Sequence, residues 1–203
     1  MVKLLHVVGS PMEERSYSRR AAETFLAAWA GRHPGGEVET LDLWQAHLPV
    51  FDKLGSAGKF KASRGLPHTA GEAAAWAGIE AVARHFAGFD GWVVSCGMWN
   101  FGMPYRLKHY VDLVVQPRIS FDPVAGKGML EGRPMQLVLA SGGRYEDGSP
   151  ADFLLPHLRA IFGFVGITDI RVLRVMGTGS QSERAEAALA EASAGAREAA
   201  AVF

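Results

Sequence analysis

The sequence predicts a three-layer α/β domain in which a five-stranded parallel sheet carries helices on both faces. Short β-branched or aliphatic runs alternate along the chain with segments of helical periodicity. The runs are apolar at nearly every position rather than at alternate ones, which is typical of strands buried on both faces. Strand–helix–strand units with right-handed crossovers give a doubly wound sheet. No repeat and no shift in composition marks a boundary, so we expect a single domain over residues 1–203.

The five strands are expected, in chain order, at residues 2–8, 38–43, 91–96, 135–140 and 170–175. Apolar residues recur at i, i+3, i+4 and i+7 between these runs, and they predict helices through residues 22–29, 107–114 and 158–165. A further helix is expected over 70–86, and an Ala-rich helix at the C-terminus.

Two capping boxes support the starts of the helix at 70–86 and of the C-terminal helix. Thr69 precedes Glu72 by three residues, and Ser180 precedes Glu183 in the same way. Pro104 and Pro156 stand where the first turn of a helix tolerates proline.

Residues 51–68 are rich in Gly, Lys and Ser and fit no helical or strand pattern. We expect a long loop here. Such a loop is either functional or mobile, or it is a tolerated surface insertion.

Composition excludes several classes of protein. Hydrophobic residues make up 48% of the chain, and 21 basic residues balance 21 acidic ones, so the basic excess typical of a nucleic-acid-binding protein is absent. There is no apolar run of about 18 residues that could span a membrane, and the N-terminus is unlike a signal peptide. The single cysteine, Cys96, fits a reducing compartment, and we expect a cytoplasmic protein.

In an open parallel sheet the ligand site lies beyond the carboxyl ends of the strands, where the strand order reverses. This rule selects the loops that follow the first, third and fourth strands. The first loop leads into a helix, whose free N–H groups and positive dipole end suit a phosphate. Ser10, Ser16 and Ser18 add hydroxyl donors, and Arg15 could add charge. The alternative is that Ser16 or Ser18 only caps the helix.

The loop after the third strand places bulky side chains and an amide at the strand–helix junction, namely Met98, Trp99, Asn100 and Phe101. A planar aromatic ligand would contact the apolar groups, and Asn100 would meet its polar edge. Alternatively, Trp99 and Phe101 belong to the core or to a contact between subunits.

The loop after the fourth strand begins Ser141-Gly142-Gly143, and paired glycines let a ligand approach the backbone closely. A plain turn is the alternative. No loop carries G-x-x-x-x-G-K-[ST] or G-x-G-x-x-G, so neither a nucleoside triphosphate site nor an NAD-type Rossmann site is supported. A mononucleotide with a terminal phosphate fits better.

Residues 98–112, M-W-N-F-G-M-P-Y-R-L-K-H-Y-V-D, resemble the M-[YW]-N-F-x-x-P-x-x-L-K-x-x-x-D segment of the FMN-dependent NADH-azoreductases. These belong to the flavodoxin-like NAD(P)H:quinone reductases. The spacing of Ser10, Ser16-Tyr17-Ser18 and Ser141–Gly143 agrees, as do residues 162–169. The resemblance implies a flavodoxin-like fold with FMN, its phosphate at Ser10 and at Ser16, Tyr17 and Ser18. It also implies that the flavin ring lies against Met98, Trp99, Asn100, Phe101, Ser141, Gly142 and Gly143.

The resemblance further implies a homodimer that reduces quinone or azo acceptors with NADH or NADPH in a ping-pong sequence. The cofactor carries the chemistry in such enzymes, so we name no catalytic side chain. Two alternatives of other classes are an FMN-binding electron carrier and an acyl-carrier-protein phosphodiesterase. Electron carriers tend to be strongly acidic, whereas this chain is neutral. The histidines show no metal-ligand spacing, which disfavours the phosphodiesterase.

Overall fold

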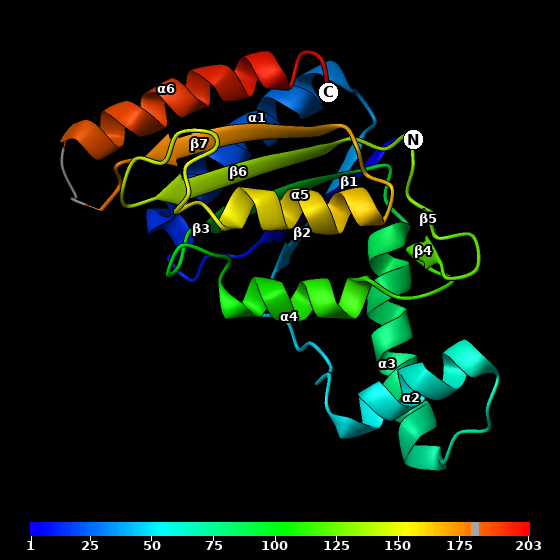
Figure 1. The fold of residues 1–203 in the computed structure, drawn as a ribbon. Helices are drawn as coiled ribbons and strands as arrows, with labels where there is room; N and C mark the ends of the chain where they lie inside the picture. The colour runs from blue at the N-terminus through cyan, green and yellow to red at the C-terminus, as the bar shows by residue number, and fades with distance from the viewer. Residues whose placement is uncertain (180–182) are drawn as a thin grey trace.

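The computed structural model describes residues 1–179 and 183–203. Five parallel strands form the central sheet in the order β2-β1-β3-β6-β7 (Figure 1). The strands are β1 (Lys3–Val8), β2 (Glu37–Asp42), β3 (Gly91–Gly97), β6 (Met135–Ser141) and β7 (Ile170–Met176). Each of them lies within one residue of its predicted position. The strand order reverses between β1 and β3, so the carboxyl ends of these strands flank the switch point that the fold class predicts.

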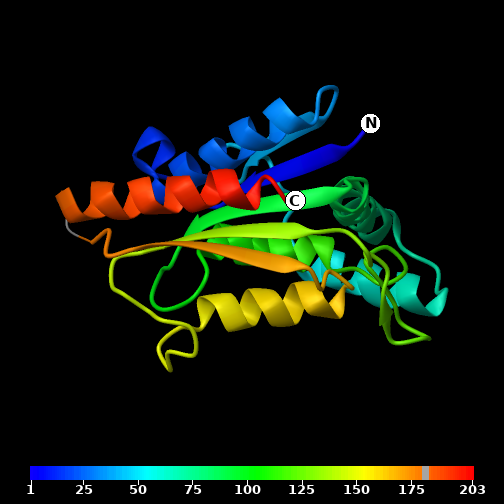
Figure 2. The ribbon, with the colours of Figure 1, turned by 90° about the horizontal axis from the view of Figure 1, so that it is seen from above.

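Helices cover both faces of this sheet, as the sequence predicts. One face carries α1 (Tyr17–Arg32) and α6 (Glu183–Ala199), and the other carries α3 (Ala70–Ala87), α4 (Tyr105–Val114) and α5 (Leu154–Phe164) (Figure 2). Two hydrophobic cores follow from this layering, one on each side of the sheet. Cys96 and Tyr110 lie in the core on the α4 side.

The prediction that all five strands are buried on both faces is wrong for the two edge strands. Most residues of β7 are only partly buried. Most residues of β2 are exposed, because β2 has no neighbouring strand on one side. Its sequence, E-V-E-T-L-D, places charged residues on this edge. Charges of this kind discourage pairing with a strand of another chain.

The loop expected over residues 51–68 is also wrong, because most of it forms α2 (Lys53–Arg64). Asp52 caps this helix, and Gly65 ends it with a left-handed backbone at φ 66°. A Cβ atom on Gly55 or on Gly58 would lie 2.7 Å from a side-chain atom of Ile79 or Trp76 in α3. The glycines that look like loop residues in the sequence therefore allow α2 to pack closely against α3.

Local signals at the helix starts are confirmed where the structure describes them. Thr69 and Glu72 form both hydrogen bonds of the capping box of α3. Pro104 is the residue that immediately precedes α4, and Pro156 lies in the first turn of α5. The capping box predicted at Ser180 and Glu183 falls on residues 180–182, outside the described part of the chain.

A short hairpin of β4 (Phe121–Asp122) and β5 (Lys127–Gly128) was not predicted. An additional 3-10 turn, η1 (Glu13–Arg15), precedes α1. Over the described residues, no helix has both the length and the apolar character that a membrane crossing requires.

Candidate functional site

A cavity of about 610 Å³ opens at the carboxyl ends of β1, β3 and β6. This volume lies within the range of small-molecule sites, roughly 300–1,000 Å³. Eight of the eleven site residues predicted from the sequence line it: Ser10, Ser16, Tyr17, Ser18, Met98, Trp99, Ser141 and Gly142. The three loops selected by the switch-point rule therefore meet around one space.

One end of the cavity is the N-terminus of α1. Ser16 is the N-cap residue, and its hydroxyl oxygen accepts a hydrogen bond from the Arg19 amide at 3.3 Å. The Ser16 and Ser18 hydroxyls lie 3.2 Å apart, and Ser10 accepts from the Met12 amide at 3.3 Å. Ser16 thus caps the helix, but donors remain free at this end of the cavity. The hydrogen bond between Ser16 and Ser18 uses only one of their two hydroxyl protons. The other proton can be donated to an anion, as can the first amides of the helix.

Charged side chains surround the same end. Arg20 of α1 forms two hydrogen bonds of 3.0 Å each with the carboxylate of Glu186 in α6. This pairing lowers the pKa of Glu186. Arg15 and Glu14 also line the space. Arg20, Glu186 and Thr178, which also line the cavity, are not predicted from the sequence, since only the tertiary structure brings α6 and the segment after β7 beside α1.

The other end of the cavity lies between the loops after β3 and β6. The Met98 amide donates to the Ala140 carbonyl at 2.7 Å, which holds the two loops together. Ser141 donates to the Gly143 carbonyl at 2.8 Å. Within the described residues the Gly142 amide has no acceptor in the protein, so it remains available to a bound group.

Asn100 and Phe101 form a tight turn directly after Trp99. Both have positive φ, 46° and 70°, and the backbones of Trp99 and Gly102 exchange two hydrogen bonds of 2.9 Å across them. This is the pattern of a type I′ turn, in which glycine usually takes the second central position. Phenylalanine in its place stores strain, which is common at functional sites.

Three predicted residues do not line this cavity. Asn100 lines a second cavity of about 890 Å³, which shares Trp99 with the first. Phe101 is half exposed and its ring lies edge-on to Tyr145 at 6.3 Å. A Cβ atom on Gly143 would lie 3.0 Å from that tyrosine ring. With Trp99 and Phe101 40% and 50% exposed, assigning them to the core is wrong.

The second cavity extends from Trp99 along α4. Lys108 and Asp112, which line it, form the i, i+4 ion pair at 2.6 Å. The remaining walls include Val50 and Phe51 from the segment before α2. An open, partly apolar space thus lies next to the first cavity.

Comparison with known proteins agrees with this geometry. A family model described as a flavodoxin-like fold matches residues 2–200. The chain is 36% identical over 198 residues to an FMN-dependent NADH:quinone oxidoreductase of Nitratidesulfovibrio vulgaris, an alignment that covers 92% of this chain and 95% of the relative. This chain belongs to the flavodoxin-like NADH:quinone oxidoreductase family. The family resemblance of residues 98–112 is thereby confirmed.

Two solved structures of similar oxidoreductases superpose over nearly the whole chain. An azoreductase from Bacillus anthracis has a TM-score of 0.89 at 27% identity, and each chain is covered completely. An FMN-dependent NADH-azoreductase from the same organism, determined in complex with FMN, has a TM-score of 0.87 at 26% identity over 98% of each chain.

The cavity of this family member fits a mononucleotide. It has a helix N-terminus with hydroxyl donors at one end, and at the other it has the soft and flat side chains of Met98 and Trp99 with the Gly142 amide. A phosphate and a planar ring need donors and apolar contact at opposite ends of the site, and these residues supply both.

Proposed function

We propose that this protein is an FMN-dependent oxidoreductase that transfers two electrons from NAD(P)H to quinone or azo-type acceptors. One observation carries the proposal. The cavity joins the N-terminus of α1 to the Met98–Trp99 edge in a chain that is 36% identical to an FMN-dependent NADH:quinone oxidoreductase. The azoreductase structures that superpose on it support the same function.

In this proposal the residues of the first cavity hold and orient FMN. Ser10, Ser16 and Ser18, with Tyr17 beside them, bind the phosphate, because hydroxyl donors and a helix N-terminus stabilise its charge. Met98, Trp99 and Ser141 lie against the ring, and amides at Gly142 and Gly143 donate to its polar edge. Asn100 and Phe101 border the ring from the second cavity and the strained turn.

The bound flavin supplies the hydride chemistry, and the protein supplies position and electrostatics. Amides aimed at an edge that gains negative charge on reduction would favour the reduced form. We therefore assign no side chain a role as acid, base or nucleophile.

A ping-pong order is part of the proposal. The second cavity borders the first at Trp99, and it is wide enough to take a nicotinamide and then an acceptor in turn. Two substrates that use one place cannot be bound at the same time. We expect parallel lines in double-reciprocal plots of the rate at several NADH concentrations.

We also propose that the protein is a homodimer. α2 and the residues that follow it expose apolar side chains, with Leu54, Phe60 and Leu66 each about half exposed. In Figure 1 α2 lies at the periphery, beyond α3 and away from the sheet. A second copy is the occupant we propose for this surface, and it would close the second cavity. Light scattering should give twice 21.9 kDa at micromolar concentration, and Phe60→Asp should shift the mass toward the monomer.

A cytoplasmic location belongs to the same proposal, supported by the single, buried Cys96 and by the use of NADH.

The test of the function is a visible spectrum of the purified protein before and after anaerobic addition of NADH. We expect flavin absorbance that bleaches, and FMN, not FAD, after heat release. Bound FMN that NADH fails to bleach would indicate an electron carrier instead.

A further inference from the structure

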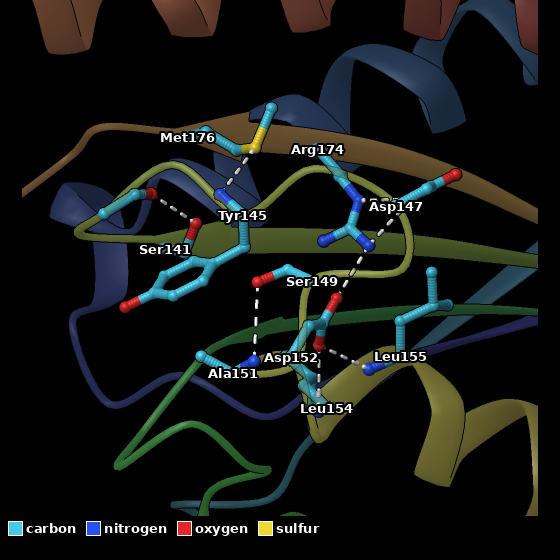
Figure 3. Close-up of polar contacts among 11 residues, drawn as sticks. Ser141, Tyr145, Asp147, Ser149, Ala151, Asp152, Leu154, Leu155, Arg174 and Met176 are labelled. Carbon is cyan, nitrogen blue, oxygen red and sulfur yellow. Dashed lines mark hydrogen bonds and ion pairs between the residues drawn. The ribbon is translucent and has the colours of Figure 1, made fainter.

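Arg174 connects the edge strand β7 to the loop that follows β6. Its guanidinium donates to Asp152 at 2.7 Å and to Asp147 at 2.9 Å (Figure 3). The Arg174 and Asp152 side chains are only 14% and 3% exposed, whereas Asp147 is 77% exposed. A buried charge is stable only when it is paired, so the Arg174–Asp152 contact fixes both groups firmly.

Asp152 connects Arg174 to the strained turn at Asn100 and Phe101 through hydrogen bonds of the backbone. Its second carboxylate oxygen accepts from the amides of Leu154 and Leu155, at 3.0 and 3.1 Å, at the start of α5. Between these residues and Asp152 stands Phe153, whose amide donates to the Phe101 carbonyl at 3.0 Å. A backbone hydrogen bond therefore connects the segment that Arg174 fixes to the carbonyl of Phe101.

The segment that Asp147 ties to Arg174 also carries the aromatic side chain of Tyr145. Tyr145 lies two residues before it, and the Tyr145 amide donates to the Met176 sulfur at 3.3 Å. The Tyr145 ring meets Phe101 edge to face, with ring centres 6.3 Å apart. Figure 3 shows the ring on the side of the loop where Ser141 lies, away from the guanidinium.

We propose that Arg174 is a positioning residue for the ring end of the site. Through Asp152 it holds the turn at Phe101, and through Asp147 it holds Tyr145 against that turn. It touches neither cavity and acts only through these loops. The proposal rests on the proposed function only where flavin reduction is measured.

The first test is hydrogen exchange of the full-length protein without added substrate. Arg174→Met should speed exchange in residues 142–155 and also in residues 98–104, which Arg174 does not contact. Arg171→Met is the matched control, because Arg171 lies on the same strand and pairs with Asp169 at 2.7 Å, far along β7 from the loops. It should leave both segments unchanged.

The second test separates ring position from phosphate binding. At saturating FMN, Arg174→Met should lower the rate of flavin reduction by NADH on the order of 10- to 100-fold, because misplacement by about 1 Å has effects of that size. The dissociation constant of FMN should stay within about threefold, since the phosphate end is remote. Arg174→Lys retains one ion pair, so its rate of flavin reduction should lie between those of the wild type and Arg174→Met.

Unchanged exchange in residues 98–104, or an unchanged reduction rate, would overturn the proposal. If Arg174→Met fails to fold, Asp147→Ala decides, because it removes an exposed carboxylate and leaves the buried pair intact. It should raise exchange in residues 142–149 and slow reduction severalfold, and no change in either would contradict the positioning role. If the wild-type protein is not reduced by NADH, the proposed function fails, and hydrogen exchange alone then decides the role of Arg174.

Discussion

The imidazole Nε2 of His6 lies 2.9 Å from the hydroxyl oxygen of Ser95, and this pair links β1 to β3 inside the protein. Both residues are buried. Burial, and to a lesser degree the positive charge of Arg19, lowers the pKa of His6 to about 4. The imidazole is therefore neutral in the folded protein at neutral pH.

The first prediction follows from this lowered pKa. The unfolded chain binds a proton at His6 below about pH 6.5, whereas the folded protein does so only near pH 4. Stability from His6 is thus complete above pH 6.5 and is lost as the pH falls toward 4. Between pH 8 and 4.5 the wild type should lose roughly 2–3 kcal/mol more unfolding free energy than His6→Asn. Urea denaturation measures this difference, with His47→Asn, which alters an exposed histidine, as the control. Parallel pH profiles for wild type and His6→Asn would contradict it.

The second prediction concerns the strain at Phe101. Glycine adopts positive φ freely, so Phe101→Gly should be more stable than Phe101→Ala by about 1 kcal/mol. Arg159, which is exposed and lies inside α5, is the matched control. There alanine should be more stable than glycine by about 1 kcal/mol. The measurement is thermal or urea unfolding of the four variants. The same order of stability at both positions would show that the turn is unstrained.

The third prediction separates FMN holding from chemistry. Ser16→Ala combined with Ser18→Ala should weaken FMN binding on the order of 100-fold, since hydrogen bonds to a charged group contribute roughly 1.5–3 kcal/mol each. Turnover at saturating FMN should change little. Asn100→Ala should instead shift the flavin spectrum and slow reduction even at saturation.

Fluorescence titration of the apoprotein and stopped-flow reduction by NADH measure the two effects. Ser56→Ala, on the exposed side of α2, is a serine control that should alter neither. Unchanged FMN affinity in the double variant would mean that Ser16 and Ser18 serve only the helix start.

The fourth prediction is that Cys96 is chemically inert. Burial raises the pKa of its thiol to about 12, and only the thiolate is reactive. A disulfide reagent at pH 8 should therefore modify the native protein no faster than the protein unfolds. In denaturant the reagent should react with one thiol per chain. Cys96→Ala should retain NADH oxidation at a modest loss of stability. Rapid labelling of the native protein would show that the thiol is accessible.

The strands, most of the helices and the edge of the sheet that holds the site can be predicted from the sequence alone. The strands β1, β3 and β6 are apolar because they are buried, and each helix repeats its buried positions, so both signals are local. The switch-point rule then brought Ser16, Met98 and Ser141 to one cavity. That residues 1–203 form a single domain stays a prediction.

The remaining features depend on contacts between residues distant in the sequence, so they become visible only in the packed structure. Gly55 and Gly58 lie so close to α3 that a larger side chain would meet Ile79 or Trp76. Arg20 lines the cavity paired with Glu186, which lies 166 residues further along the chain. The carbonyl of Phe101 accepts from the amide of Phe153, which lies far along the chain. Composition and spacing cannot record such contacts, since their energies arise only after the layers have packed.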